Sequence, residues 1–154
     1  MNVMAPTRLT ELRECRVRLT AGPAASAEAR RQVRAAICDW EVPVDPDVAV
    51  LLTSELVTNA IRHEVTGIVM LAITCSCGEL RVDVHDTSRY LPMLVDAPAE
   101  AEAGRGLMLV TTLSDEWGFY RTPAGKAVYF ALAFPPDGAE GDGRDAQGAD
   151  AWGL

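Results

Sequence analysis

Apolar residues recur along the chain with two different spacings, and these spacings predict its helices and strands. In two stretches they return every three or four residues, which predicts amphipathic helices at Ser26–Trp40, with Ser26 as a candidate N-cap, and from Pro46 to about Val65. Continuous or alternating apolar runs predict five strands. These strands are Cys15–Ala21, Gly67–Cys75, Glu79–Asp86, Trp117–Thr122 and Lys126–Phe134.

Turn residues join neighbouring strands into hairpins. Cys77-Gly78 is a tight two-residue turn between the second and third strands, and the segment 123–125 joins the last two. Thr87–Ala103 contains prolines and a run of Ala and Glu, so it is predicted to be a long loop. Because long loops inside compact domains usually carry function or are disordered, this one is a candidate lid. A third helix is predicted from Gly104 towards Trp117.

The order of these elements predicts the fold. Strands follow one another as hairpins instead of alternating with helices, which favours a mixed, mostly antiparallel sheet with helices packed on one face. The fold class is therefore α/β, a two-layer α/β sandwich. Residues 1–134 are predicted to form one domain. From Pro135 the chain is rich in Gly, Asp and Ala, which predicts that 135–154 is a disordered acidic tail.

The net charge of the chain excludes some classes of binding partner. The 154 residues carry a formal net charge of −8, so the sequence lacks the basic footprint of a protein that binds nucleic acid or an anionic membrane directly. No apolar run approaches the length of a membrane span, and the sequence shows no secretory leader. The expected location is the cytoplasm, and the expected partners are small ligands or proteins.

The second helix carries polar residues on its apolar stripe, where its core face should be. Glu55, Asn59 and His63 are spaced by four residues and lie about 40° apart on a helical wheel, next to Leu52 and Leu56. A buried carboxylate, amide and imidazole are costly unless something satisfies them, and hydrated Mg²⁺ with a triphosphate would do so. The alternative is that the stripe ends here and the three side chains are merely hydrated.

The third strand ends in a second candidate group, Asp83 and Asp86 on either side of His85. A carboxylate fixed at a strand end can accept a hydrogen bond from an exocyclic amine, which distinguishes adenine from guanine. Aspartate at a strand end is also an ordinary turn or cap residue, so both interpretations stay open.

A third candidate group lies at the start of the third helix. Gly104 and Gly106 flank Arg105 where free backbone amides and the positive end of the helix dipole favour phosphate. The glycines fit neither the dinucleotide fingerprint nor the phosphate loop that ends in Lys-Ser/Thr. A flexible joint is the alternative.

Taken together and in this order, the three groups resemble the Bergerat-fold (GHKL) ATPases, the superfamily of gyrase B, sensor histidine kinases and anti-sigma factor kinases. Glu55-x-x-x-Asn59 with His63 resembles the N box, Asp86 the adenine-binding aspartate of the first G box, and Gly104-x-Gly106-Leu107 the second G box. The similarity covers roughly Val17 to Phe134. The small size and the hairpin 125–129 are most similar to the stand-alone bacterial anti-sigma serine kinases.

The resemblance implies a function and a site. It implies ATP and Mg²⁺ as cofactors and a protein kinase that phosphorylates a serine or threonine of an anti-sigma antagonist and sequesters a sigma factor. Dimeric relatives imply a homodimer. Each residue of the site has an implied role: Glu55 the base, Asn59 the Mg²⁺ ligand, His63 a neighbour of the phosphate oxygens, Asp86 the adenine reader, and Gly104, Arg105, Gly106 and Leu107 the triphosphate cradle.

One departure from the family pattern supports an alternative function. The first G box of the family usually continues Asp-x-Gly-x-Gly, whereas Asp86 is followed by Thr87, Ser88, Arg89 and Tyr90. Without glycine, backbone approach to a nucleotide is harder. The alternative is a non-catalytic protein-binding module of the same fold with weak or lost nucleotide binding.

Overall fold

The computed structural model describes residues 12–63, 67–89 and 102–135, and for His63 and 102–106 it describes the backbone alone. These residues form three helices and five strands. Their bounds in chain order are β1 Arg13–Thr20, α1 Ala25–Asp39, α2 Pro46–His63, β2 Ile68–Ser76, β3 Glu79–Asp86, α3 Glu102–Leu113, β4 Glu116–Arg121 and β5 Lys126–Ala133.

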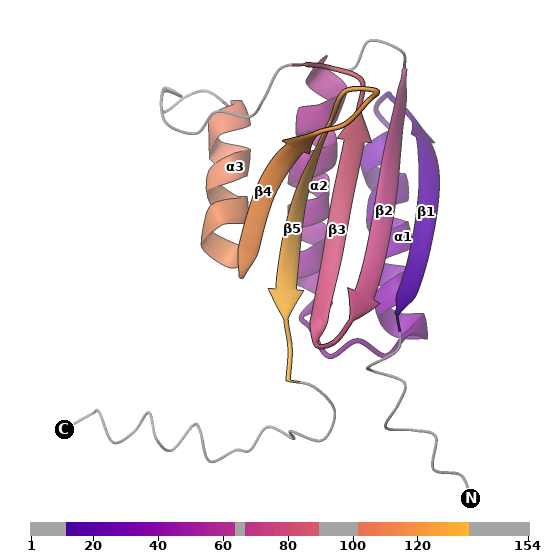
Figure 1. The fold of residues 1–154 in the computed structure, drawn as a ribbon, viewed down its shortest axis with the longest axis vertical. Coiled ribbons are helices and arrows are strands. Elements are labelled where there is room, and N and C mark those ends of the chain that lie inside the picture. Colours follow the sequence, from indigo (N-terminus) through magenta and orange to yellow (C-terminus); the bar gives the residue numbers. More distant parts are fainter. Residues whose placement is uncertain (1–11, 64–66, 90–101, 136–154) are drawn as a thin grey trace, which may run out of the picture.

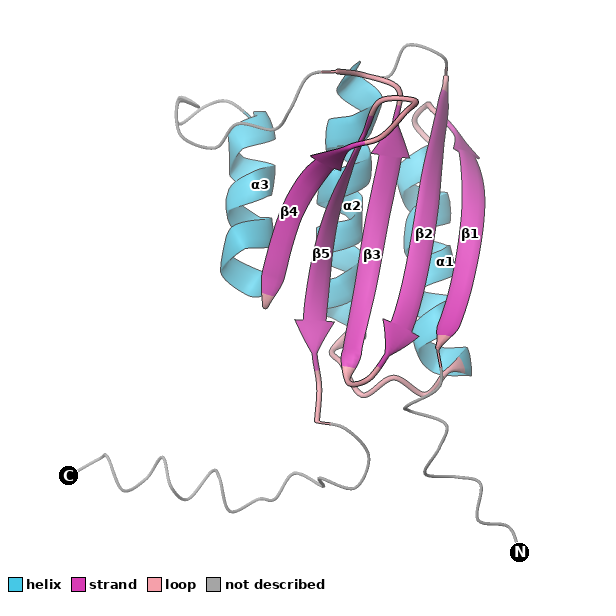
Figure 2. Ribbon diagram, viewed as in Figure 1, coloured by secondary structure: helices cyan, strands magenta, loops and turns pink. Residues whose placement is uncertain are grey.

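The strands form one sheet in the order β1-β2-β3-β5-β4, and all four pairings are antiparallel. Figure 1 shows α1 and α2 behind the sheet and α3 beside the edge strand β4. The other face of the sheet carries no helix of the described chain, as the colouring by secondary structure in Figure 2 makes clear. The predicted two-layer α/β sandwich is confirmed.

The core lies between the sheet and the helices because alternate residues of each strand face that side. In β3 the helix-facing residues include Val82 and Val84, and in β5 they include Phe130, all at most 1% exposed. Leu52 and Leu56 of α2 pack into the same cluster. The apolar stripe read from the sequence is therefore the core face of α2.

Local chemistry explains where α2 begins and where the chain turns between β2 and β3. Pro46 occupies the first position of α2, and Asp45 Oδ1 accepts the Asp47 N–H at 2.9 Å, as an N-cap does. Cys77 and Gly78 both have positive φ, at 46° and 81°, which is the backbone of a two-residue hairpin turn. The start of α2 at Pro46 and the hairpin turn at Cys77-Gly78 agree with the predictions from sequence.

Several element boundaries differ from prediction, and the start of α1 and both ends of α3 are the informative cases. Ser26 does not cap α1, which starts at Ala25 without a side-chain cap, and the Ser26 hydroxyl instead lies 3.3 Å from Thr58 Oγ1 of α2. The third helix begins at Glu102 and ends at Leu113. It ends early because the Ser114 N–H closes its last turn on Val110 O, after which Asp115 donates to Ala131 O and joins the sheet. The predicted tail lies, except for Pro135, outside the described residues.

Candidate functional site

The elements that carry the three candidate groups have ends that lie at one end of the sandwich. In Figure 1 the C-terminal end of α2, the end of β3, the start of α3 and the β4–β5 turn all lie at the top of the molecule. Helix α2 contacts α3, β3 and β5, so it forms the centre of this arrangement. The fold therefore brings together the elements that the sequence left far apart.

Helix α2 holds Glu55 and Asn59 at the border of its core face, and not buried within the apolar stripe as the sequence predicted. Both are partly exposed, while Leu52, Leu56 and Ala60 beside them are buried. Among the described residues neither polar side chain has a hydrogen-bond partner. Their oxygens are thus available to a hydroxyl or to a hydrated cation. His63 ends α2, but its side chain lies outside the description.

Asp86 ends β3 on the helix-facing side, and both of its carboxylate oxygens accept hydrogen bonds within the protein. Lys126 Nζ donates to both carboxylate oxygens, at 2.9 Å to Oδ1 and 2.7 Å to Oδ2, and the Ser88 N–H donates to Oδ1 at 2.8 Å. The side chains of Lys126 and Asp86 are 1% and 0% exposed. Antiparallel pairing makes the two residues direct neighbours in β5 and β3.

Lys126 is a site residue that the sequence analysis did not select. It is the only lysine of the chain, and it begins an apolar strand. Counting by twos from Val128 and Phe130 places it on the helix-facing side, where a lysine needs an anionic partner. This alternation along β5 is the sequence feature that could have identified Lys126 as a buried lysine. The partner itself depends on strand register.

Gly125 lets the two strand ends approach. A Cβ at this position would lie 2.2 Å from Asp86 O and 2.6 Å from Thr87 Cα, distances that no side chain tolerates. The turn before β5 is therefore packed directly on the backbone that carries Asp86.

The proposed triphosphate cradle is described only in part. Gly104, Arg105 and Gly106 lie in the first turns of α3, which starts two residues earlier than predicted, and their side-chain surroundings are outside the description. Leu107 is buried in the core. Residues 90–101, most of the candidate lid, lie outside the described residues.

Asp83 belongs to a different cluster from Asp86, because it faces the open side of the sheet. Arg81 donates to it at 2.9 and 3.0 Å, and the Tyr120 hydroxyl donates at 2.8 Å. The hydrogen bond to Asp83 raises the pKa of Arg81, and burial, followed by the Asp83 contact, raises the pKa of Tyr120. The Arg81 guanidinium also lies 3.8 Å from the centre of the Tyr129 ring.

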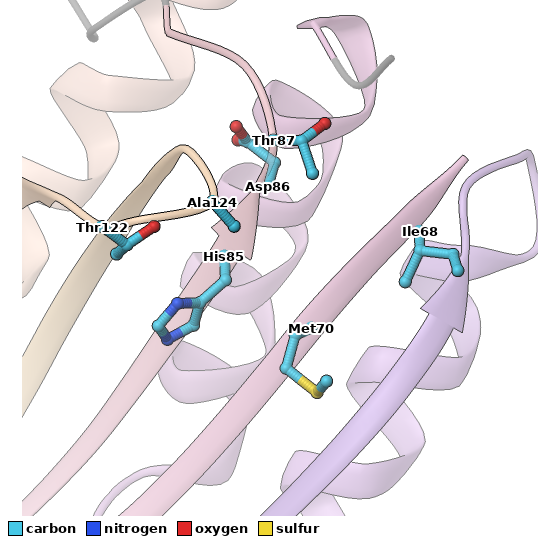
Figure 3. A pocket seen from close by; sticks show the side chains of 7 residues that line it. All are labelled: Ile68, Met70, His85, Asp86, Thr87, Thr122 and Ala124. Atoms are coloured by element: carbon cyan, nitrogen blue, oxygen red, sulfur yellow. The ribbon is translucent and has the colours of Figure 1, made fainter. Parts of the chain in front are cut away.

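A cavity of about 280 Å³ lies on the same open face, at the end of β3. Figure 3 shows His85 and Met70 in front of the strands, on the side away from the helices. Burial, opposed by the nearby Asp83 charge, lowers the pKa of His85. The cavity is lined by Ile68, Met70, His85, Asp86, Thr87, Thr122 and Ala124.

Two absences apply only to the described part of the chain. Within residues 12–63, 67–89 and 102–135 no three His, Cys, Asp or Glu residues cluster as metal ligands. None of the helices in these ranges combines the length and the hydropathy needed to cross a membrane.

Comparisons with known proteins identify the family and the fold. A family model described as "Histidine kinase-like ATPase domain" matches residues 19–132. A search of curated proteins finds no match. One similar solved structure is that of the RsbU and RsbW domains of Rv1364c from Mycobacterium tuberculosis, with 19% identity and a TM-score of 0.59. The match covers 81% of this chain and 33% of that one, and it shows the fold.

Proposed function

Since the chain belongs to the histidine kinase-like ATPase domain family, we propose that it is an ATP-binding regulator of the anti-sigma factor type. It transfers the terminal phosphoryl group of ATP to a serine or threonine of an antagonist protein and sequesters a sigma factor. Family membership implies nucleotide binding. The kinase activity, the protein partners and the cytoplasmic location belong to the proposal.

The observation that carries the proposal is the state of Glu55 and Asn59. Both are partly exposed, lack hydrogen-bond partners in the described structure and lie on the helix that forms the centre of the candidate site. Glu55 would accept the proton of the attacking hydroxyl, and the Asn59 carbonyl oxygen would bind Mg²⁺. Mg²⁺ would neutralise phosphate charge, so the protein contributes mainly positioning.

The two halves of the site fit Mg-ATP differently. The acid–amide pair of α2 suits the hydrated cation. Because α3 begins at Glu102, the Gly104 amide lies in its first turn and can bind phosphate, whereas the Gly106 amide lies one turn inside the helix and is bonded to the carbonyl four residues before it. At the purine end the fit is poor, because Lys126 and Ser88 already occupy the Asp86 carboxylate.

Phosphoryl transfer is tested with labelled ATP, Mg²⁺ and candidate antagonist proteins. The wild-type protein should transfer labelled phosphate to an antagonist. Glu55→Ala should transfer far less, because the base is removed. Glu28→Ala is the matched control, since Glu28 lies in the first turn of α1, where it pairs with Arg31 and Gln32. Equal labelling by wild type and Glu55→Ala, or none by either, would refute the assigned role.

The alternative is a non-catalytic protein-binding module, and the occupied Asp86 carboxylate favours it. Thermal unfolding with and without Mg-ATP separates the two functions. A ligand at about 100 times its dissociation constant adds about 2.7 kcal/mol to the free energy of unfolding. An unchanged melting temperature at millimolar Mg-ATP would exclude nucleotide binding and favour the protein-binding module.

A homodimer is also part of the proposal. Strands β1 and β4 are the edges of the sheet, and exposed edges can pair with a second copy. Sedimentation of the purified chain over a concentration range tests this, and a single monomeric mass throughout would exclude it.

A further inference from the structure

The ion pair between Lys126 and Asp86 leads to an inference about what controls nucleotide affinity, and it rests on the proposed function. We propose that Lys126 limits purine recognition at this site. Its ammonium group occupies the carboxylate that would accept the exocyclic amine of adenine, so the base binds only after Lys126 has left Asp86.

The carboxylate is engaged at both oxygens. Lys126 Nζ donates to Oδ1 and to Oδ2, and the Ser88 N–H donates to Oδ1 as well. Because the side chains of Asp86 and Lys126 are 0% and 1% exposed, neither group presents a surface to an incoming ligand. The pair is sealed inside the helix-facing layer.

The competition favours the ammonium over the base. Both contacts are made to an ionised carboxylate, but the ammonium adds a full opposite charge beside it, whereas the amine of adenine is a neutral donor. A displaced ammonium must also find water or another anion, because a lone buried charge is costly. Adenine therefore binds Asp86 at the expense of a stronger internal contact.

The backbone holds the two residues in place. Asp86 and Lys126 are direct neighbours across β3 and β5, and Gly125 packs against the Asp86 backbone with no room for a Cβ. The strand ends therefore cannot separate without breaking this packing. Rotation of the long lysine side chain is the route that leaves the sheet intact.

Replacing the lysine tests the proposal directly. Lys126→Thr removes the ammonium but leaves a hydroxyl donor beside Asp86. Its affinity for Mg-ATP, measured by titration calorimetry, should exceed that of wild type on the order of tenfold, the difference between a charged and a neutral competitor. Equal or weaker binding by a folded Lys126→Thr would overturn the proposal.

Arg81→Thr is the matched control. Like Lys126→Thr, it removes the cation of an ion pair. This pair, Arg81–Asp83 of β3, faces the open side of the sheet. Its affinity for Mg-ATP should equal that of wild type. An equal gain in both variants would show that loosening the sheet, and not releasing Asp86, strengthens binding.

A second measurement needs no mutation and holds even if Lys126→Thr does not fold. Lys126 is the only lysine, so reductive methylation followed by mass spectrometry reports one ε-amine. The buried amine should resist methylation in the free protein and become reactive with saturating Mg-ATP. If it stays protected while nucleotide is bound, the proposal is wrong.

The outcomes separate this proposal from the proposed function. Nucleotide binding by wild type with Lys126 still protected overturns the role of Lys126 alone. No binding by wild type or by folded Lys126→Thr at millimolar Mg-ATP overturns nucleotide binding, and the role of Lys126 falls with it.

Discussion

The buried ion pair between Lys126 and Asp86 allows a stability prediction with a defined size. Lys126→Met keeps the length of the side chain but leaves a carboxylate at 0% exposure without its cation. Removing one partner of a buried pair costs about 3–5 kcal/mol. Since single domains are stable by about 5–15 kcal/mol, this loss is a large share of the total.

The same reasoning predicts rescue by a second change. Asp86→Asn removes the orphaned charge and keeps an oxygen for the Ser88 N–H, which donates to Oδ1 in wild type. The double variant Asp86→Asn with Lys126→Met should recover most of the loss, because no buried charge remains. The two single losses should therefore be far from additive.

Urea unfolding followed by circular dichroism and by the fluorescence of Trp40 and Trp117 measures these free energies. The m-value should stay constant if only stability changes. At about 2–4 °C per kcal/mol, Lys126→Met should also melt about 10 °C below wild type. Arg81→Met serves as the comparison, because the Arg81 side chain is partly exposed although Asp83 is buried. Its pair with Asp83 is 35% and 9% exposed, and Asp83 keeps the Tyr120 hydroxyl, so it should cost about 1 kcal/mol.

Two results would refute this reasoning. A loss below about 1 kcal/mol for Lys126→Met would mean that the pair contributes no more than a surface salt bridge. Simple additivity in the double variant would mean that the two side chains act independently in spite of their 2.7 Å contact.

Two further predictions concern the surroundings of this pair. Gly125→Ala should lower the free energy of unfolding by about 1–3 kcal/mol, because its Cβ would overlap Asp86 O, whereas Gly22→Ala meets no atom within 4 Å and should leave urea unfolding nearly unchanged. His85 has a pKa lowered by burial, so the unfolded chain binds its proton at a higher pH than the folded one, and the stability of wild type should fall as the pH drops below about 6.5. His85→Gln should remove that part of the pH dependence in urea titrations from pH 8 to pH 5, and an unchanged slope would exclude His85 as its source.

Much of the fold could be predicted because it depends on local patterns. Helix α2 begins at Pro46 as expected, and the hairpin between β2 and β3 turns at Cys77-Gly78 as expected. Periodicity and turn residues act within a few positions of themselves, so they are legible in the sequence. The start of α3 was misplaced by two residues. Glu102 and Ala103 are good helix formers, so the helix begins before the glycines that were expected to open it.

The candidate site was only partly predictable. Spacing by four identified Glu55 and Asn59 as neighbours on one helix face, and the structure holds both at the border of the core. Their proposed roles stay predictions. Asp86 was selected as an acceptor, but its actual partner came from a strand 40 residues away. No local pattern reveals such a pairing.

The sequence by itself determined which segments form helices and strands, which face of each is apolar, and the family to which the chain belongs, because these features are set by the order and spacing of side chains. Only the tertiary structure decided that Lys126 faces Asp86. That contact depends on the pairing of β3 with β5 in one register, and on Gly125 permitting their close approach. A shift of one residue would have turned the lysine to the opposite face of the sheet.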